Sequence, residues 1–207
     1  YAEEVALNRT PVKEQTICSV DLGINTDAVC TIMRPDGTIL GRKFINFPSD
    51  KDRMYRVLGR IRRFQREHGS RQVQGRWAYA KRLNTELGKK IAREIVFYAS
   101  ENRADVIVFE YLEMKGKLSG KKKQKLQMWR KRDIQKRCGQ QAHRKGIRIS
   151  RICAWNTSRL AFDGSGKIDR DIQDHRLCTF QNGKRYNCDL SASYNIGARY
   201  FIREILK

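Results

Sequence analysis

TICSVDLGINTDAVCTIM, residues 16–33, contains two apolar runs of β-type residues on either side of a polar turn. The tetrapeptide RPDG follows at 34–37, and a third run, TILGRKFINF, occupies residues 38–47. A Pro-Asp-Gly sequence is a strong turn signal, so three consecutive strands joined by short connections are expected here. These residues therefore predict an antiparallel meander, with Asp21 at the end of its first strand.

The pattern after the meander is helical. Apolar residues recur at helical spacing from Asp50 to Asn102, and Gly69–Ser70 is expected to separate two helices. DVIVFEYL, 105–112, is a compact apolar run that suits a strand buried on both faces. A further helix is expected over 124–145 and a further strand over 146–155.

The last fifty residues contain a loop, a hairpin and a helix. Gly164, Ser165 and Gly166 mark the loop, and Asn182–Gly183 stands between two β-type runs, which is the strongest short hairpin signal. The final helix is expected to run from about Asp189 nearly to the end of the chain. This order of elements predicts an α/β fold, a mixed sheet flanked by helices, with a small hairpin insertion before the last helix.

Basic residues dominate the composition. The chain has 207 residues with 44 Lys and Arg against 22 Asp and Glu, which gives a net charge of +22. Between Lys115 and Arg148 there are 14 Lys or Arg and one acid, Asp133. Such a concentration of positive charge favours a polyanionic partner, so nucleic-acid binding is expected. The residues expected to contact nucleic acid are Lys121, Lys122, Lys123, Lys125, Arg130, Lys131, Arg132, Lys136 and Arg137. Trp129 in the same segment either packs the helix onto its sheet, the commoner role, or stacks on an unpaired base.

Several classes of protein do not fit this sequence. No apolar run approaches the roughly 18 residues needed to span a bilayer, and no signal-peptide pattern opens the chain. The six cysteines form no CxxC pair. We therefore expect an intracellular, cytoplasmic protein with reduced thiols and no membrane partner.

Three acidic residues punctuate apolar segments. Asp21 ends one run, Glu110 nearly closes another, and Asp189 opens the last helix. Taken singly, each has an ordinary explanation, because strand ends meet solvent and Asp often caps a helix. Taken together, three carboxylates at neighbouring strand ends and a helix start can bind two divalent cations, which catalyse phosphoryl displacement. Magnesium suits such an oxygen-rich site.

The segments around these acids resemble a known family. DLGIN at 21–25, IVFEYLEM at 107–114 and CDLSASYNIGAR at 188–199 are similar to the three motifs of a RuvC-type nuclease. NTSR at 156–159 and LGKKIAREIVFYAS at 87–100 resemble elements of one lineage, the insertion-sequence TnpB proteins and the type V CRISPR effectors. The resemblance extends over nearly everything after residue 16.

The resemblance implies a ribonuclease H-like fold and hydrolysis of DNA strands under RNA guidance. It implies that Asp21, Glu110 and Asp189 hold two Mg²⁺ ions, for which Mn²⁺ could substitute. Water would attack phosphorus and leave a 3′-hydroxyl and a 5′-phosphate. Arg159 is the candidate for holding the scissile phosphate, since guanidinium binds phosphate bidentately. Asn195 falls on a family position, where a structural polar contact is expected, and Asp27 is expected to be solvated.

The sequence departs from the family where relatives carry four zinc-binding cysteines. Cys178 alone stands in the place of the second pair, and Cys188 is out of register. His175 and two cysteines could be combined into a ligand set, but we expect no zinc. We expect instead that turn and packing energy of the hairpin around Asn182–Gly183 replaces the metal.

The expected domain organisation follows the motifs. It comprises 1–15 as a linker from a missing amino-terminal part, 16–155 as a RuvC-like core with a helical insertion over about 50–103, 156–188 as a degenerate zinc-finger-like insertion, and 189–207 as the final RuvC helix. The expected partners are a DNA target strand and, through a longer parent protein, a guide RNA. The sequence leaves the oligomeric state open.

Three alternatives to a metal-dependent DNA endonuclease remain. The first is a nuclease-inactive, RNA-guided DNA-binding regulator, and the second is a junction resolvase-like nuclease. The third is a basic RNA-binding module without an active site. The presence of Asp21, Glu110 and Asp189 favours the endonuclease.

Overall fold

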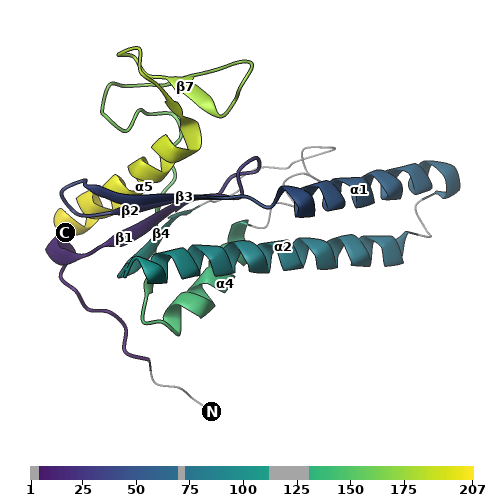
Figure 1. The fold of residues 1–207 in the computed structure, drawn as a ribbon, viewed down its shortest axis with the longest axis horizontal. Coiled ribbons are helices and arrows are strands. Elements are labelled where there is room, and N and C mark those ends of the chain that lie inside the picture. Colours follow the sequence, from purple (N-terminus) through teal and green to yellow (C-terminus); the bar gives the residue numbers. More distant parts are fainter. Residues whose placement is uncertain (1–4, 70–72, 112–130) are drawn as a thin grey trace.

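The computed structural model describes residues 5–69, 73–111 and 131–207 (Figure 1). Its elements, in chain order, are η1 (Val12–Glu14), β1 (Ile17–Asp21), β2 (Ala28–Met33), β3 (Ile39–Ile45), α1 (Pro48–His68), α2 (Gln74–Glu101), β4 (Val106–Tyr111), α4 (Lys131–His143), β5 (Arg148–Cys153), β6 (Asp169–Arg170), β7 (Leu177–Thr179), β8 (Arg185–Asn187) and α5 (Cys188–Ile205). The meander, the two helices that follow it, the later strands and the last helix are confirmed. Within the described residues, the helix expected over 124–145 is α4.

The main sheet has five strands in the order β3-β2-β1-β4-β5. β1, β2 and β3 pair antiparallel, whereas β1, β4 and β5 pair parallel, so the sheet is mixed as expected. The parallel pairing brings the carboxyl ends of β1 and β4 to one edge, with Val20 opposite Phe109. The acids that follow these two residues, Asp21 and Glu110, therefore end neighbouring strands.

Helices cover both faces of the sheet (Figure 1). On one face Ile107 and Phe109 of β4 pack in a cluster with residues of α2 and α4. On the other face Val106 and Val108 pack with residues of α5. All four side chains are almost fully buried, which explains the continuous apolar run of this strand.

The last helix packs closely on the meander at Gly197. A Cβ atom at Gly197 would meet Met33 Sδ at 2.8 Å and Ser19 Oγ at 3.2 Å. Nearby, the hydroxyl groups of Thr31 and Ser193 are hydrogen-bonded at 2.6 Å. This close packing fixes α5, and therefore Asp189 in its first turn, relative to the sheet.

The helices α1 and α2 form a long antiparallel hairpin that extends beyond the sheet (Figure 1). The hairpin has its own apolar cluster, which includes Met54, Ile61 and Ala80, with Trp77 packed against it. The two helices therefore support each other where the sheet no longer covers them.

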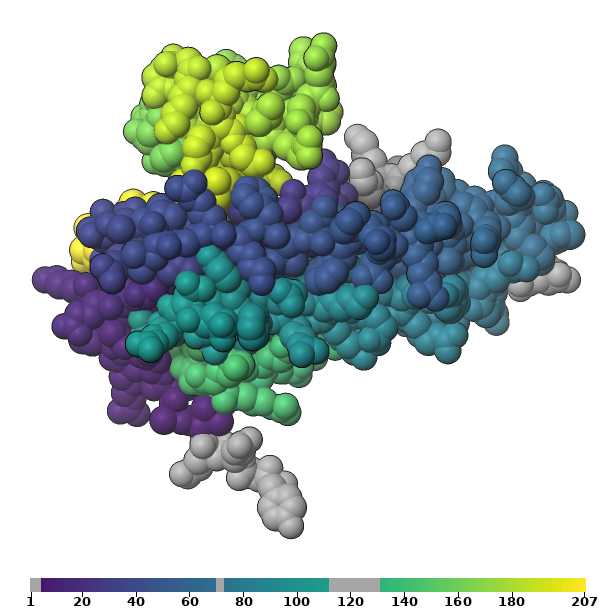
Figure 2. All heavy atoms as spheres, viewed as in Figure 1, coloured from purple at the N-terminus to yellow at the C-terminus, as the bar shows by residue number. Residues whose placement is uncertain are grey.

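The segment between β5 and α5 forms a separate lobe that stands out from the rest of the surface (Figure 2). Its three short strands pair antiparallel in the order β6-β7-β8, and β7 and β8 form the expected hairpin. Phe162 stacks edge-on against Phe180 and Tyr194, with ring centroids 5.5 and 4.9 Å apart. The aromatic cluster thus joins the lobe to α5.

All six cysteines are free thiols, and Cys178 and Cys188 pack together in the apolar centre of the lobe. In the parts of the chain that the structure describes, no helix has both the length and the hydropathy of a membrane span.

Candidate active site

Asp21, Glu110 and Asp189 line one pocket of about 350 Å³. They come from the end of β1, the end of β4 and the first turn of α5, three elements far apart in sequence. The pocket is also lined by Leu22, Gly23, Ile24, Asn25, Lys131, Ala154, Thr157, Ser158, Arg170, His175 and Arg176. The sheet topology and the close packing of α5 thus bring together the acids of the three sequence motifs.

Asp189 is not the cap of its helix. The N-cap residue is Asn187, whose side-chain oxygen accepts a hydrogen bond from the backbone N–H of Leu190 at 2.9 Å. Asp189 lies two residues further on and lines the pocket. Because Asn187 satisfies the helix end, the carboxylate of Asp189 is available for another role.

The three carboxylates interact electrostatically. Burial raises the pKa of Asp21 from 3.8 to about 7, with the charges of Glu110 and Asp189 acting in the same direction. Lys131 and Arg170 oppose this shift. Burial also lowers the pKa of the Lys131 ammonium, although the same three carboxylates raise it. The pocket therefore holds a concentration of negative charge that nearby cations offset only in part.

Thr157 orients Glu110. The Thr157 hydroxyl donates a hydrogen bond to Glu110 Oε1, and the side-chain amide of Asn195 donates to the Thr157 carbonyl at 2.9 Å. Asn195 also donates to the Leu160 carbonyl at 2.8 Å, so its role is the structural polar contact expected from sequence. Glu110 is buried, and Thr157 satisfies one of its oxygens.

The lobe before α5 supplies two arginines to the pocket, Arg170 and Arg176, and His175 also lines it. Arg170 donates to the Ser158 carbonyl at 3.1 Å, and Arg176 pairs with Asp174 at 2.9 Å. No motif in the sequence marks the two arginines, because their approach to the acids depends on how the lobe packs in the folded chain.

Two residues, Arg159 and Asp27, have surroundings that differ from those expected from the sequence. Arg159, the candidate for the scissile phosphate, is exposed and does not line the pocket, although the adjacent Ser158 does. Its role in phosphate binding stays a prediction. Asp27 is buried rather than solvated, because it accepts a hydrogen bond from Phe47 N–H at 2.8 Å and pairs with Lys51 at 3.1 Å.

The residues of the pocket fit a magnesium site by their chemistry. The donors are carboxylate oxygens, which Mg²⁺ prefers, and their mutual repulsion would be relieved by a divalent cation. Among residues 5–69, 73–111 and 131–207, no three His, Cys, Asp or Glu side chains, those of Asp21, Glu110 and Asp189 included, are arranged so that they alone could hold a metal ion. Mg²⁺ does not need a closed protein cage, because it keeps several waters and uses one or two carboxylates with substrate phosphate.

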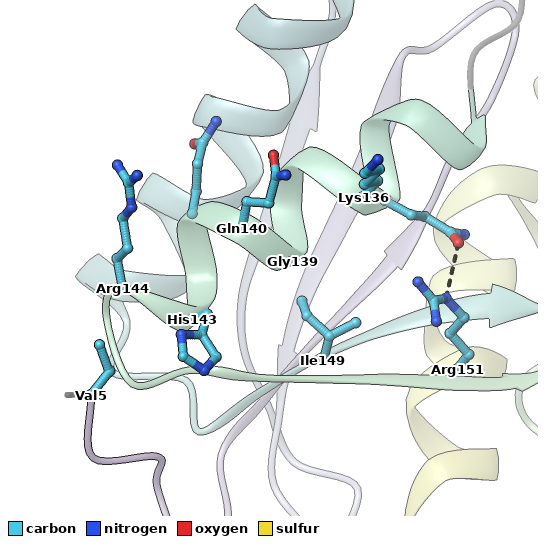
Figure 3. A pocket seen from close by; sticks show the side chains of 10 residues that line it. Val5, Lys136, Gly139, Gln140, His143, Arg144, Ile149 and Arg151 are labelled. Carbon is cyan, nitrogen blue, oxygen red and sulfur yellow. Dashed lines mark hydrogen bonds between the residues drawn. The ribbon is translucent and has the colours of Figure 1, made fainter. Parts of the chain in front are cut away.

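A second, larger hollow of about 910 Å³ lies between α4 and β5 (Figure 3). Lys136 and Gln140 of α4, and Arg144 directly after it, line one wall, while Ile149 and Arg151 of β5 contribute to the other. His143 also lines it, and among the residues that the structure describes no carboxylate does. We call this hollow the α4–β5 groove.

The α4–β5 groove accounts for only part of the basic segment expected to contact nucleic acid. Lys136 lines the groove, whereas Lys131 lines the acidic pocket. Arg132 is exposed, and Arg137 pairs with Asp133 at 2.9 Å. Lys121, Lys122, Lys123, Lys125 and Arg130, together with Trp129, lie outside the described residues.

Gln135 connects the α4–β5 groove to the strand that carries Glu110. Its side-chain oxygen accepts from Arg151 Nε at 3.2 Å, the bond drawn in Figure 3. Its amide nitrogen donates to the Glu110 carbonyl at 2.9 Å. Gln135 is buried, so its hydrogen bond to the Glu110 carbonyl is protected from water.

No family model matches the sequence, and no curated protein matches it. Solved structures do match. A complex of Cas12f1 with single-guide RNA and target DNA aligns over 87% of this chain and 49% of its own, with a TM-score of 0.70 and 19% identity. A Cas12f ternary complex aligns over 95% and 40%, with a TM-score of 0.63 and 16% identity. The mini-RNA-guided endonuclease Cas_phi3 aligns over 90% and 45%, with a TM-score of 0.58 and 11% identity.

The common feature of these structures and this chain is the fold. The five-stranded mixed sheet flanked by helices is the RuvC-like fold of type V CRISPR effectors, as the sequence motifs predicted. The chain spans about half the length, or less, of these three relatives. At identities of 11–19% this likeness concerns the fold alone.

Proposed function

We propose that this chain is the catalytic part of a metal-dependent DNA endonuclease of the RNA-guided, TnpB-like type. The observation that carries the proposal is the convergence of Asp21, Glu110 and Asp189 on one pocket. Each acid ends or opens an element whose position is fixed by the core. A structural role for each acid separately would not explain why all three line the same hollow.

The residues of the pocket divide into two groups. Asp21, Glu110 and Asp189 would hold two Mg²⁺ ions, or Mn²⁺ in their place. Such ions stabilise the attacking and leaving oxygens of an in-line phosphodiester hydrolysis. Arg170 and Arg176 would bind the phosphate of the strand, since guanidinium groups match phosphate geometry. Thr157 would keep Glu110 in one orientation.

The expected substrate and partner are a DNA strand and a guide RNA. The net charge of +22 supports binding of polyanions, and the α4–β5 groove offers the positive side chains of Lys136, Arg144 and Arg151. The similar Cas12f1 structure contains single-guide RNA and target DNA. In the proposed function, guide RNA would bind through the longer parent protein.

One observation favours a second candidate function, a nuclease-inactive DNA-binding regulator. Lys131 lines the pocket and interacts electrostatically with all three acids. A lysine ammonium among these carboxylates would offset their charge and compete with a divalent cation. Equilibrium dialysis with Mn²⁺ separates the two functions, because the endonuclease requires Mn²⁺ binding that Asp189→Asn weakens.

A cleavage assay tests the proposed function directly. Labelled single-stranded DNA is incubated with the chain and Mg²⁺ or Mn²⁺, and the matched variants are Asp189→Asn and, as a control, Asp52→Asn at an exposed site on α1. Asp189→Asn should reduce cleavage to background, while Asp52→Asn should cleave like the unchanged chain. Strand binding in EDTA should be retained by both. Cleavage by Asp189→Asn at the normal rate would refute the proposed function, and preferential cleavage of four-way junctions would favour a resolvase.

A further inference from the structure

Trp155 is a large aromatic residue exposed beside the acidic pocket. Its exposed fraction is 72%, and its sequence neighbours Ala154, Thr157 and Ser158 all line the pocket. Trp77, by contrast, packs in the cluster of the α1–α2 hairpin. A single exposed apolar residue is ordinary on a protein surface, and Trp155 differs from such a residue in its position and in the rigidity of its turn.

The turn that carries Trp155 is held at several points. Asn156 adopts a left-handed conformation with φ of 58°, and its carbonyl accepts from Arg159 N–H at 3.1 Å. On the following residue, Thr157 bonds to Glu110 through its hydroxyl and to Asn195 through its carbonyl. The backbone of Trp155 is therefore fixed relative to Glu110, and the exposure of the indole is not the result of a loosely attached loop.

The same turn is linked to Arg170, which the proposed function makes a phosphate-binding side chain. Arg170 lines the pocket and donates to the carbonyl of Ser158, three residues after Trp155. In a nucleic-acid strand each phosphate is followed by a base, and a strand held by its phosphates directs unpaired bases to the side. An exposed aromatic close in sequence to pocket residues, on a turn bonded to an arginine of the pocket, suits a single strand, whose backbone follows positive charge while its bases stack on aromatic rings.

We infer that Trp155 stacks on the base of an unpaired nucleotide of the DNA strand that enters the acidic pocket. This inference rests on the proposed function for its substrate, and it adds a positioning residue to the pocket. Stacking on an indole tolerates every base, because each has a π-face. Trp155 would therefore position the strand next to the scissile phosphate without restricting its sequence.

The experiment measures binding in EDTA, where hydrolysis does not occur. Fluorescence anisotropy of a labelled oligothymidylate is compared for the unchanged chain, Trp155→Ala, Trp155→Phe and Tyr55→Ala, an aromatic on α1 with the same exposed fraction of 72%. Trp155→Ala should weaken binding about tenfold, the effect of losing one stacked base. Trp155→Phe should retain most of the affinity, and Tyr55→Ala should bind like the unchanged chain.

A series of strands with one abasic site at successive positions identifies the stacked base. At one or two positions the unchanged chain should lose about tenfold in affinity, and Trp155→Ala should show no further loss there. Three results would overturn the stacking role: equal losses of affinity in Trp155→Ala and Tyr55→Ala, no loss in either variant, or no strand binding by the unchanged chain. An exposed tryptophan that binds a protein partner would leave strand affinity unchanged in both variants.

The outcome is separate from that of the proposed function. A chain that cleaves DNA but binds equally well after Trp155→Ala keeps its nuclease function and loses the stacking role. A chain that shows base-dependent binding through Trp155 but never cleaves, with any of the divalent cations tried, refutes the nuclease function alone.

Discussion

Asn187 caps the helix on which Asp189 stands two residues later. The Asn187 side chain accepts the backbone hydrogen bond from Leu190, whereas Asp189 lines a pocket with Asp21 and Glu110. Asn187 thus serves as the cap, and the carboxylate of Asp189, for which the sequence also allowed a capping role, lies in the pocket.

Asn187→Ala and Asp189→Asn should therefore affect stability and cleavage in opposite ways. Asn187→Ala removes the cap and should lower the free energy of unfolding by about 1 kcal/mol, with cleavage largely retained. Asp189→Asn removes a negative charge from a group of carboxylates, so stability should not fall, although cleavage should be lost. Urea denaturation and the cleavage assay measure the two properties. A larger loss of stability in Asp189→Asn than in Asn187→Ala would mean that Asp189 has a structural role.

Thr157 provides a second test of the pocket. Thr157→Val keeps the shape of the side chain but leaves a buried oxygen of Glu110 without its donor, a change that costs about 1–3 kcal/mol. We expect a lower kcat with little change in the affinity for single-stranded DNA. Thr157→Ser keeps the hydroxyl and should restore most of the rate. Failure of the Ser variant to restore the rate would assign the effect to packing of the methyl group.

Much of this site could be predicted from the chain because its signals are local. Asp21 and Glu110 each follow apolar runs typical of buried strands, and parallel pairing then brings such strand ends together. Asp189 is ambiguous in the sequence, since a carboxylate at a helix start has a simpler role as a cap. The ambiguity ends only with the hydrogen bond from Leu190 to Asn187.

The cations of the pocket could not be predicted because they depend on long-range packing. Arg170 and Arg176 stand in a lobe with short strands and no family motif, and Lys131 belongs to a helix whose basic residues all have the same expected role. Only the structure separates Lys131, in the acidic pocket, from Lys136, in the α4–β5 groove. Helical spacing alone does not identify which face meets the strand ends.

The raised pKa of Asp21 predicts that replacing Asp21 stabilises the folded chain and that the gain in stability depends on pH. The pKa of Asp21 is about 7 in the folded chain, whereas its ordinary value is 3.8. Between these two pH values the folded state keeps a proton that the unfolded state has released. Stability therefore falls as pH rises from about 4 to 7, and the full cost of the charged carboxylate is present above that range. Asp21→Asn does not incur this cost.

In EDTA, Asp21→Asn should therefore melt at a higher temperature than the unchanged chain at pH 8, and the difference should be much smaller at pH 5. Thermal unfolding followed by circular dichroism measures it. Mn²⁺ should raise the melting temperature of the unchanged chain more than that of the variant, since a ligand of the folded state stabilises it. If Asp21→Asn and the unchanged chain differed in melting temperature by the same amount at pH 5 and pH 8, the charge of Asp21 would not be the cause.

The α4–β5 groove predicts how salt affects strand binding. Removal of one cation that binds a phosphate should reduce the slope of log affinity against log salt by about 0.7 for a single strand. Lys136→Gln and Arg144→Gln should each show such a reduction, because both side chains line the groove. Lys89→Gln on α2 removes the same charge from a residue paired with Glu86 at 2.7 Å and is the matched control. Equal slopes for Lys136→Gln and Lys89→Gln would exclude the groove as a phosphate-binding surface.

The lobe before α5 should fold without zinc. Its aromatic cluster around Phe162, Phe180 and Tyr194 joins it to α5, and His175 lines the acidic pocket. We expect that EDTA leaves the melting temperature unchanged and that metal analysis finds less than one zinc per chain.

Phe162→Ala should lower the free energy of unfolding by about 3 kcal/mol, because aromatic packing is removed. One equivalent of zinc, with unfolding by EDTA, would mean that Cys178, Cys188 and His175 bind the metal after rearranging, because metal binding and folding of small domains are coupled.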